Sequence, residues 1–416
     1  MGESVIFHCD VNNAYLSWQS AYGVLNNGDI DYRDIPAVIG GSESKRHGIV
    51  LAKSTPAKKM GIKTGETIFS ARKKCANLII IPPRYDIYVR CSKFMIDILK
   101  EYTPNIERTS IDECFLDFSG MDYIYNDYIE LAKTIQNRIY NDLGFTINIG
   151  ISTNKLLAKM ASDFEKPNKI HTLWKSEIKT KMWPLPIGKL YMVGKASEKK
   201  LIDLNIKTIG DLANIDKNII SRILKANGEK LYRYANGIED SKVISEDIES
   251  KGIGNSTTMS FDITDRYTAH MVILSLCENL GMRLRGDKRL CTTISVNIKE
   301  SSFVSYSKQK KLSGPIDSTR GIYEQAISLF DKSWKGSPIR HLGVHITDLV
   351  NESSSQISLF DNMNLSKEKA LDTVIDSLRN KYGNSSVVRS SFINSGLKSM
   401  AGGVGEEDYP KIQNTM

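Results

Sequence analysis

The sequence predicts a multidomain protein in which an α/β half is followed by a helical segment and a separate α+β module. The chain has 416 residues, which is too long for one ordinary core and suggests roughly two to four domains. Strand-like and helix-like runs alternate in the first part of the chain. After a polar, acid-containing linker at 239–250 the pattern changes to longer alternating strands with helices between them.

Strands and helices alternate through the first half of the chain. Four apolar runs have the length and the flanking residues of strands: 5–10, 76–83, 110–120 and 146–152. Apolar residues at helical spacing fill 84–102 and the segment that ends at Ile139. Another helix is expected directly after the fourth strand, with Thr153 placed to cap it and Pro167 to end it. This order predicts an α/β layer with acidic residues at strand ends.

The second half divides into a small helical segment and an α+β module. In 184–240, two short helices flank a turn that contains glycine, and Thr208 with Asp211 resembles a capping box. Two alternating strands and two helical runs predict the module: 291–299, 340–349, 268–285 and 318–334. The final segment begins with a Ser-rich stretch and then has an apolar stripe that predicts a helix over 367–382, closed by Gly383. The stripe consists of Leu371, Val374, Ile375, Leu378 and Tyr382.

Composition excludes several classes of protein. No apolar run approaches the ~18–20 residues that span a bilayer, and the start of the chain lacks the pattern of a signal peptide. We therefore expect a cytoplasmic protein without a membrane partner. The six cysteines are scattered and form no CxxC pair, which disfavours a zinc site or a disulfide framework. The formal net charge of +8 permits a polyanionic partner without requiring one.

Three acidic residues stand at strand ends: Asp10, Asp112 and Glu113. A carboxylate in an apolar strand is costly to bury unless a cation compensates it. Mg²⁺ prefers oxygen ligands, and two such ions about 3.5–4 Å apart stabilise both the attacking and the leaving oxygen of a phosphoryl transfer. The alternative is that these acids pair with lysines or cap turns, as most single acids do. We assign no chemistry to His8, His341 and His345.

Motifs around the three acids resemble those of a known family. The stretches FHCDVNNAYLSW, TSIDECFLD and GISTNKLLAKMASDFEKPNK occur in family order and resemble the motifs of Y-family (UmuC/DinB-like) translesion DNA polymerases, nearest to the UmuC-like branch. The resemblance implies a right-hand fold, with palm, fingers, a helical thumb containing a helix-hairpin-helix, and a little finger. The implied limits are 1–18 and 78–168 for the palm, 19–77 for the fingers, 169–240 for the thumb, 245–350 for the little finger and 351–416 for a tail.

The resemblance also implies roles for individual residues in the palm and fingers. The metal ligands would be Asp10, Asp112, Glu113 and the carbonyl of Val11, holding two Mg²⁺ ions with Mn²⁺ as a substitute. Tyr15 matches the steric gate that excludes ribonucleotides. Other residues implied to contact the nucleotide are Asn12, Ala14, Thr55, Lys58 and Lys166. Thr55 stands where many members have Tyr, and Lys58 replaces a more frequent Arg, which alone can form a bidentate fork.

DNA and protein partners are implied for the remaining segments. The thumb turn at Val193, Gly194 and Lys195 resembles a site where backbone amides hold a DNA phosphate, although Met192 replaces the usual first glycine. In the little finger the expected DNA contacts are Lys251, Gly254, Arg283, Arg285, Lys288 and Arg289, within a basic region that also contains Lys299. Gln356, Ser358, Leu359 and Phe360 resemble the peptide that docks on the bacterial sliding clamp. Accessory SOS-type proteins are further expected partners.

The expected function is template-directed DNA synthesis across damage, with low fidelity and no proofreading. Primer–template DNA and deoxynucleoside triphosphates would be the substrates. Nucleases and nucleotide cyclases also place paired carboxylates on strands, so a two-metal nuclease or cyclase is one alternative. A catalytically inactive, clamp-bound DNA-binding scaffold is another.

Overall fold

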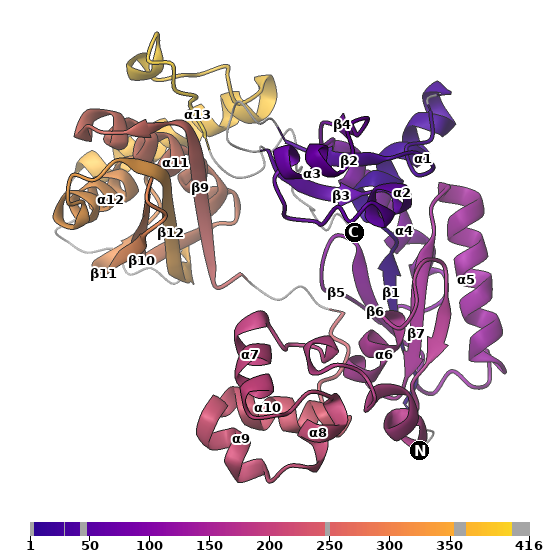
Figure 1. The fold of residues 1–416 in the computed structure, drawn as a ribbon. Coiled ribbons are helices and arrows are strands. Elements are labelled where there is room, and N and C mark those ends of the chain that lie inside the picture. The colour runs from indigo at the N-terminus through magenta and orange to yellow at the C-terminus, as the bar shows by residue number, and fades with distance from the viewer. Residues whose placement is uncertain (1–3, 29, 42–47, 246–249, 353–362, 402–416) are drawn as a thin grey trace. The chain divides into compact units, whose positions relative to one another are not determined.

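The computed structural model describes residues 4–28, 30–41, 48–245, 250–352 and 363–401, with the side chains of 363–366 excepted. The chain forms two compact units (Figure 1), the first comprising 1–41 with 49–247 and the second comprising 42–48 with 248–416. None of the helices in these described ranges is long and apolar enough to cross a membrane.

A five-stranded sheet lies at the centre of the first unit (Figure 1), in the order β5-β6-β1-β7-β8. Its strands are β1 (Ile6–Val11), β5 (Ile106–Arg108), β6 (Glu113–Asp117), β7 (Ile147–Ser152) and β8 (Ile170–Thr172). β1 pairs antiparallel with both β6 and β7. The four predicted strands of this half are confirmed, because β4 (Ile79–Ile81) corresponds to the run at 76–83.

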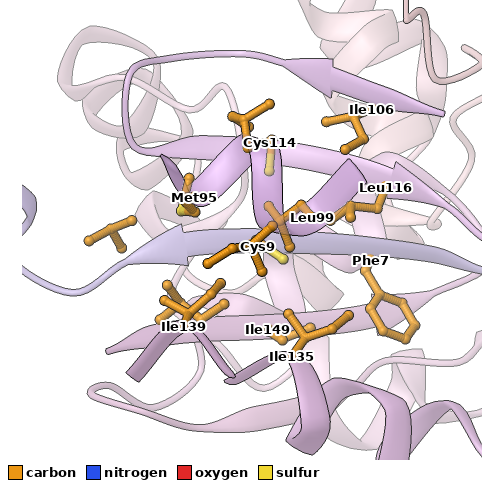
Figure 2. Close-up of a cluster of buried hydrophobic side chains, with 14 of the residues drawn as sticks. Phe7, Cys9, Met95, Leu99, Ile106, Cys114, Leu116, Ile135, Ile139 and Ile149 are labelled. Carbon is orange, nitrogen blue, oxygen red and sulfur yellow. The ribbon is translucent and has the colours of Figure 1, made fainter. Parts of the chain in front are cut away.

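The two faces of this sheet carry different residues because side chains alternate along each strand. Phe7 and Cys9 point into an apolar core (Figure 2) formed with three helices. These helices are α1 (Ala14–Asn27), α4 (Tyr85–Lys100) and α5 (Tyr128–Leu143). His8 and Asp10 alternate with the core residues and therefore face the other side, where α6 (Lys155–Ser162) packs on β1 and β7.

The ends of α6 differ from those predicted. Its first turn is capped by Asn154, whose side chain accepts a hydrogen bond from the Leu157 N–H at 2.9 Å. The prediction that Thr153 caps the helix was wrong, because Thr153 lies one residue too early to reach that amide. The helix ends at Ser162, so Pro167 does not terminate it.

The remainder of the first unit contains a small sheet and a helical cluster. The small sheet has the order β3-β2-β4, with β2 (Ala37–Gly40) and β3 (Val50–Lys53), and the helices α2 (Thr55–Lys59) and α3 (Ile68–Lys74) accompany it. The cluster contains α7 (Lys195–Asp203), α8 (Ile209–Asn214), α9 (Lys217–Leu224) and α10 (Ala226–Ala235), preceded by the short helical turns Lys175–Glu177, Ile178–Met182 and Ile187–Lys189. The predicted capping box of Thr208 and Asp211 is confirmed at the start of α8. The predicted boundary between palm and fingers, after residue 18, falls inside the helix α1.

The second unit is an antiparallel sheet with helices on one face, which confirms the predicted α+β character. The sheet has the order β11-β10-β12-β9. Its strands are β9 (Gly252–Ile263), β10 (Arg289–Glu300), β11 (Ser305–Ile316) and β12 (Ile339–Asn351). The helices α11 (Arg266–Gly286) and α12 (Thr319–Ser333) share a core with the sheet, and α13 (Met363–Tyr382) and the turn Ser390–Phe392 follow.

The helix α13 packs through charged residues. Its predicted apolar stripe is largely exposed, with Leu371 at 59% and Val374 at 58%. Asp372 and Arg379 are buried instead, at 6% and 5%. The predicted end is confirmed, since the Gly383 N–H donates to the Arg379 carbonyl at 2.8 Å and Gly383 has a φ of +91°.

We expect Gly150→Ala to destabilise the first unit, because α6 lies directly against this position of β7. A Cβ atom at Gly150 would stand 2.0 Å from the Ala158 carbonyl oxygen and 2.4 Å from the Ser162 nitrogen. Overpacking of this kind costs about 1–3 kcal/mol or more. Chemical denaturation measures the effect. Gly314→Ala is the control, because a Cβ there meets nothing within 4 Å, and equal stability of the two variants would contradict this packing.

Candidate active site

A cavity of about 420 Å³ lies in the first unit beside the end of β1. Most of the predicted metal and nucleotide residues line it: Asp10, Val11, Asn12, Ala14, Tyr15, Thr55, Lys58, Asp112 and Lys166. Asn13, Lys53 and Thr64 also line it and were not predicted. The sheet, α1 and the segment with β3 and α2 therefore contribute to one concave surface.

The three acids, which are far apart in sequence, meet at one end of the β1–β6 pair. Asp10 and Glu113 are directly opposite each other in the register of the two strands. The Val11 N–H donates to the carbonyl oxygen of Asp112 at 3.1 Å, which fixes Asp112 beside the same strand. The Asp112 carboxylate accepts a hydrogen bond from the Ser110 hydroxyl at 2.6 Å.

Lysines neutralise the two strand carboxylates. Lys166 pairs with Asp10 and, at 2.7 Å, with Asp163, while Lys159 pairs with Glu113. Burial raises the pKa of Asp10 to about 6, against the opposing charge of Lys166. Burial also favours the neutral form of Glu113, but contacts with His8 and Lys159 outweigh it and lower the pKa of Glu113 to about 2. The sequence predicted neither Lys159 nor His8 as part of the site.

These groups fit a divalent cation by their chemistry. Asp10, Asp112, Glu113 and the Val11 carbonyl offer the oxygen donors that hard cations prefer. Asp10 is 5% exposed, and the raised pKa shows that its negative charge is incompletely compensated. Over the described ranges no three His, Cys, Asp or Glu side chains converge into a metal-holding group. Asp10 and Glu113 are instead turned toward Lys166 and Lys159.

Asn12 lines the cavity, but its side chain is engaged in a buried polar network. Its amide nitrogen donates to the Asn148 side-chain oxygen at 3.0 Å, and its own oxygen accepts from the Asn168 N–H at 2.8 Å. Asn148, which is fully buried, donates in turn to the carbonyls of Ser162 and Glu165. Together Asn12 and Asn148 fix the segment that carries Lys166. The Asn12 side chain therefore helps to position this segment, and its nucleotide contact stays a prediction.

Tyr15 lies in the first turn of α1 and lines the cavity with part of its surface. Its ring stacks on that of Tyr88, with centroids 4.4 Å apart and an interplanar angle of 7°. Tyr85 meets the same ring edge-on at 6.0 Å. The aromatic cluster anchors the Tyr15 ring at the cavity wall. Tyr15 therefore both packs against aromatic residues of the core and faces the cavity.

Two lysines also line the cavity. The start of α2 is capped by Ser54, and this short helix presents Thr55 and Lys58 to the cavity. Lys53 at the end of β3 adds a second ammonium, whose pKa is lowered by burial and by the charge of Lys58. An anionic ligand would relieve this repulsion. The alternation of β3 was too short for the sequence to indicate where Lys53 points.

In the thumb-like turn, the residue that replaces the usual first glycine keeps a backbone conformation typical of glycine. Met192 adopts a left-handed φ of +72°, which a bulky residue rarely does. The Val193 N–H donates to the Leu190 carbonyl at 3.0 Å, so this predicted phosphate-binding amide is already used. Gly194 caps α7 and Lys195 begins it, which leaves the start of this helix as the more accessible anion-binding position.

The predicted DNA contacts of the second unit fall into different environments. Lys251 and Lys288 are exposed. Arg283 donates to the Gly254 carbonyl at 3.4 Å, and Arg289 donates to the Leu349 carbonyl at 3.0 Å. Both guanidinium groups therefore already make a hydrogen bond within the second unit.

Arg285, which was predicted to contact DNA, is engaged within the second unit. Its side chain is 10% exposed and forms ion pairs with Asp376 at 2.6 Å and Asp372 at 3.2 Å. Both acids lie on α13, more than 80 residues after Arg285 in the sequence, so the local sequence around Arg285 did not indicate these ion pairs. A cavity of about 640 Å³ beside Arg285 is lined by acidic and basic residues of the second unit.

The predicted clamp-binding residues Gln356, Ser358, Leu359 and Phe360 lie outside the described residues. Their role stays a prediction.

We expect Asn148→Ala to reduce kcat by about tenfold or more, because a displaced Lys166 segment misplaces a charge that must meet the substrate. The variant should also lose stability, since it leaves buried carbonyls without donors, at about 1–3 kcal/mol each. Steady-state kinetics and chemical denaturation measure the two effects. Asn214→Ala is the control, because that amide makes an exposed hydrogen bond within α8. A destabilised variant with unchanged kcat would contradict the positioning role.

We expect Arg285→Ala to destabilise the second unit by about 3–5 kcal/mol, because it leaves two poorly exposed carboxylates unpaired. The salt dependence of DNA affinity should stay unchanged, since the guanidinium is already occupied. Arg266→Ala is the control, because Arg266 is 62% exposed and its nearest acid is 3.9 Å away. A lower salt dependence of DNA affinity without a loss of stability would indicate that Arg285 contacts DNA.

Family models and known relatives match most of the chain. The impB/mucB/samB family model matches residues 9–163, the model of that family's C-terminal domain matches 250–359, and the HHH-motif model of the IMS family matches 175–206. DNA polymerase IV of Clostridium acetobutylicum is 52% identical over 386 residues, which cover 93% of this chain and 97% of that protein. DNA polymerase IV 1 of Bacillus subtilis is 36% identical over 382 residues, 91% of each chain.

A solved structure shares the fold. A Y-family DNA polymerase chimera of Dbh and Dpo4 superposes with a TM-score of 0.72 at 24% identity, covering 83% of this chain and 99% of that one. The right-hand polymerase fold is thereby confirmed. None of these relatives tests the predicted proximity to the UmuC-like branch. The chain belongs to the impB/mucB/samB family of Y-family DNA polymerases.

Proposed function

We propose that Asp10, Asp112 and Glu113 hold two Mg²⁺ ions, with Mn²⁺ as a substitute, in this translesion DNA polymerase. The chain is a DNA-directed DNA polymerase that uses primer–template DNA and deoxynucleotides and depends on a divalent metal. The observation that supports the ligand assignment is the register of Asp10 opposite Glu113, with Asp112 tied to the next residue of β1. When bound, the metal pair lowers the barrier by activating the primer hydroxyl and neutralising the leaving pyrophosphate.

The cationic wall of the cavity is proposed to orient the triphosphate. Lys58 and Lys53 face the cavity from α2 and β3, and Lys166 faces it from the segment fixed by Asn12 and Asn148. Their ammonium groups offset the charge that develops on the phosphoryl oxygens during transfer. Lysine provides point charges here in place of an arginine fork, so the orientation depends on several cations acting together.

Tyr15 is proposed to act as the steric gate. Its ring is immobilised by stacking on Tyr88 and is exposed to the cavity on another part of its surface. A ring fixed in this way cannot move aside for a 2′-hydroxyl, so a ribose would collide with it. Ala14, in the same turn, also lines the cavity.

We also propose how the chain binds the DNA backbone and which proteins it binds. The exposed cations Lys251 and Lys288, together with the start of α7 at Lys195, are proposed to bind the DNA backbone. The 356–360 peptide is proposed to bind the sliding clamp, and accessory SOS-type proteins are proposed as further partners in a cytoplasmic setting. The relatives, which are named DNA polymerases, give no support to a nuclease, a cyclase or an inactive scaffold.

We expect Asp10→Asn, Asp112→Asn and Glu113→Gln each to lower primer extension on the order of a thousandfold, the effect of losing several kcal/mol of charge stabilisation. The amides keep the shape of the side chains, so binding of primer–template DNA should persist. Extension assays on undamaged and abasic templates measure the effect, and Glu130→Gln, an exposed acid of α5, is the control. Full activity in any of the three variants would exclude that residue as a ligand, and shortening of the primer would indicate a nuclease.

We expect Tyr15→Ala to raise ribonucleotide incorporation relative to deoxynucleotide incorporation on the order of a hundredfold, because the colliding ring is removed. The ratio of kcat/KM values for the two nucleotides measures this. Tyr15→Phe keeps the ring and should keep the selectivity, as should Tyr88→Phe, which preserves the stack beneath Tyr15. An unchanged ratio in Tyr15→Ala would place the gate elsewhere.

A further inference from the structure

We propose that His8 is a positioning residue for Glu113, and that it orients this carboxylate through a hydrogen-bond donor at Nε2. The inference rests on the proposed function, because Glu113 is one of the proposed metal ligands. Side chains that bind a metal are commonly oriented by a second group behind them. Three features assign this task to His8: its place in β1, the neighbours of its ring and the state of its Nε2 atom.

The strand register places His8 beside Glu113. His8 and Asp10 are two residues apart in β1, so their side chains lie on the same face of the sheet. On β6, His8 is opposite Phe115 and Asp10 is opposite Glu113. His8 and Glu113 are therefore diagonal neighbours on adjacent strands, within reach of long side chains. The His8 Nε2 atom lies 3.8 Å from Oε2 of Glu113.

The imidazole ring of His8 is enclosed and has little room to turn. His8 is fully buried, and the ring of Phe115 lies against it with centroids 4.7 Å apart. On its other side, His8 is opposite Gly150 of β7, the position on which α6 packs closely. The Nδ1 atom lies 2.8 Å from the hydroxyl of Ser162, which is also fully buried. These contacts fix the ring so that Nε2 faces the Glu113 carboxylate.

The Nε2 atom of His8 is buried and makes no hydrogen bond with any of the described residues. The Oε2 atom of Glu113, at 3.8 Å, is beyond hydrogen-bonding distance. A buried polar atom without a partner is uncommon and costly, so it calls for an explanation. A small shift of the carboxylate toward Nε2 closes this gap. The ring therefore holds a donor ready for Glu113.

Electrostatics decides which ring nitrogen carries the proton. The Ser162 hydroxyl has one proton and two acceptors at 2.8 Å, which are Nδ1 of His8 and the Lys159 carbonyl. With the ring proton on Nδ1, a lone pair of Nε2 would face a carboxylate. With the proton on Nε2, the hydroxyl donates to Nδ1 and an N–H faces Glu113, which is the favourable arrangement. An imidazolium carries the same Nε2 proton, so the donor is present in both protonation states.

Two groups of different kinds hold the Glu113 carboxylate. Its Oε1 atom pairs with the ammonium of Lys159, and its Oε2 atom faces His8. The ammonium is a charge on a flexible stem, and a divalent cation bound to Glu113 competes with it directly. The His8 donor has no such competition, because it approaches the other oxygen from an enclosed ring. His8 therefore keeps the carboxylate oriented whichever cation Glu113 meets.

Two substitutions separate the two nitrogens of the His8 ring. In His8→Gln the amide nitrogen reaches the place of Nε2 and keeps a donor toward Glu113. In His8→Asn the amide reaches only the place of Nδ1, which keeps the contact with Ser162 and loses that donor.

The probe is Mn²⁺ alone, added to the full-length protein on a primer–template with a dideoxy-terminated primer. Electron paramagnetic resonance of the unbound Mn²⁺ measures its affinity. We expect His8→Asn to weaken Mn²⁺ binding on the order of tenfold and His8→Gln to bind like the wild type. The Mg²⁺ concentration that gives half-maximal primer extension should rise by a similar factor in His8→Asn. The affinity of this variant for DNA should stay unchanged.

Controls separate this role from a loss of folding. Glu113→Gln removes the proposed ligand itself and sets the size of its complete loss. His171→Asn is the matched control, because Nε2 of His171 in β8 is also buried without a hydrogen bond to the described residues. It should bind Mn²⁺ like the wild type. Chemical denaturation of His8→Asn and His8→Gln should give similar stabilities, so that stability does not explain the difference in metal affinity.

The position of the ring proton is tested without any substitution. In ¹⁵N NMR spectra of the wild-type protein with labelled histidines, the signals that are lost in His8→Gln belong to His8. Their chemical shifts should show a protonated Nε2. A ring with its proton on Nδ1 alone would lack the donor and overturn the inference.

The metal-binding results divide the remaining outcomes. If His8→Asn and His8→Gln weaken Mn²⁺ binding equally, His8 supports the fold and does not position the carboxylate. If both bind like the wild type while Glu113→Gln does not, the inference fails and the proposed ligand set stands. If Glu113→Gln itself binds Mn²⁺ like the wild type, Glu113 is not a ligand, and the proposed ligand set and the inference fail together.

Discussion

The burial of a carboxylate at the end of β1 is the constraint on which the site depends. Asp10 lies in a strand whose every residue is buried, and a charge in such a place requires compensation. Lys166 provides that compensation from a segment more than 150 residues away in sequence, and Glu113 is held opposite by the strand register. The sheet therefore concentrates negative charge at one point, and the surrounding cations are positioned by it. A divalent cation bound at this point would compensate the same negative charge.

The helix α6 connects this constraint to the rest of the first unit. Gly150 allows it to lie directly on β7, so that Lys159 reaches Glu113 and Ser162 bonds His8 at 2.8 Å. The other side of α6, at Leu156 and Leu157, belongs to the core of the helical cluster that includes α7 to α10. One short helix thus packs against both the five-stranded sheet and the helical cluster.

Local patterns made much of this predictable from sequence. The strands around Asp10 and Glu113 have strong apolar patterns, so these strands could be predicted from short segments, whereas the proposed ligand set came from the resemblance of the motifs to the family. Asn148 was not predicted, because its importance lies in hydrogen bonds to Asn12 and to the loop before Lys166, which only the folded chain brings together. The cap of α6 was misplaced by one residue, since Thr153 and Asn154 are both good capping residues and only the start of the helix distinguishes them.

The basic region of the second unit shows why counting charges along the sequence is insufficient. Arg285 and Lys299 belong to the same cationic stretch, yet α13 brings Asp372 and Asp376 to Arg285, whereas the Lys299 ammonium lies 4.9 Å from the centroid of the Phe303 ring. The helix α13 buries Asp372 and exposes Leu371 and Val374. Its apolar periodicity therefore does not predict which face packs against the unit, because ion pairs determine that face. The fate of each cation is decided by what the tertiary fold places next to it. A cation enclosed by acids, such as Arg285, stabilises the unit from within.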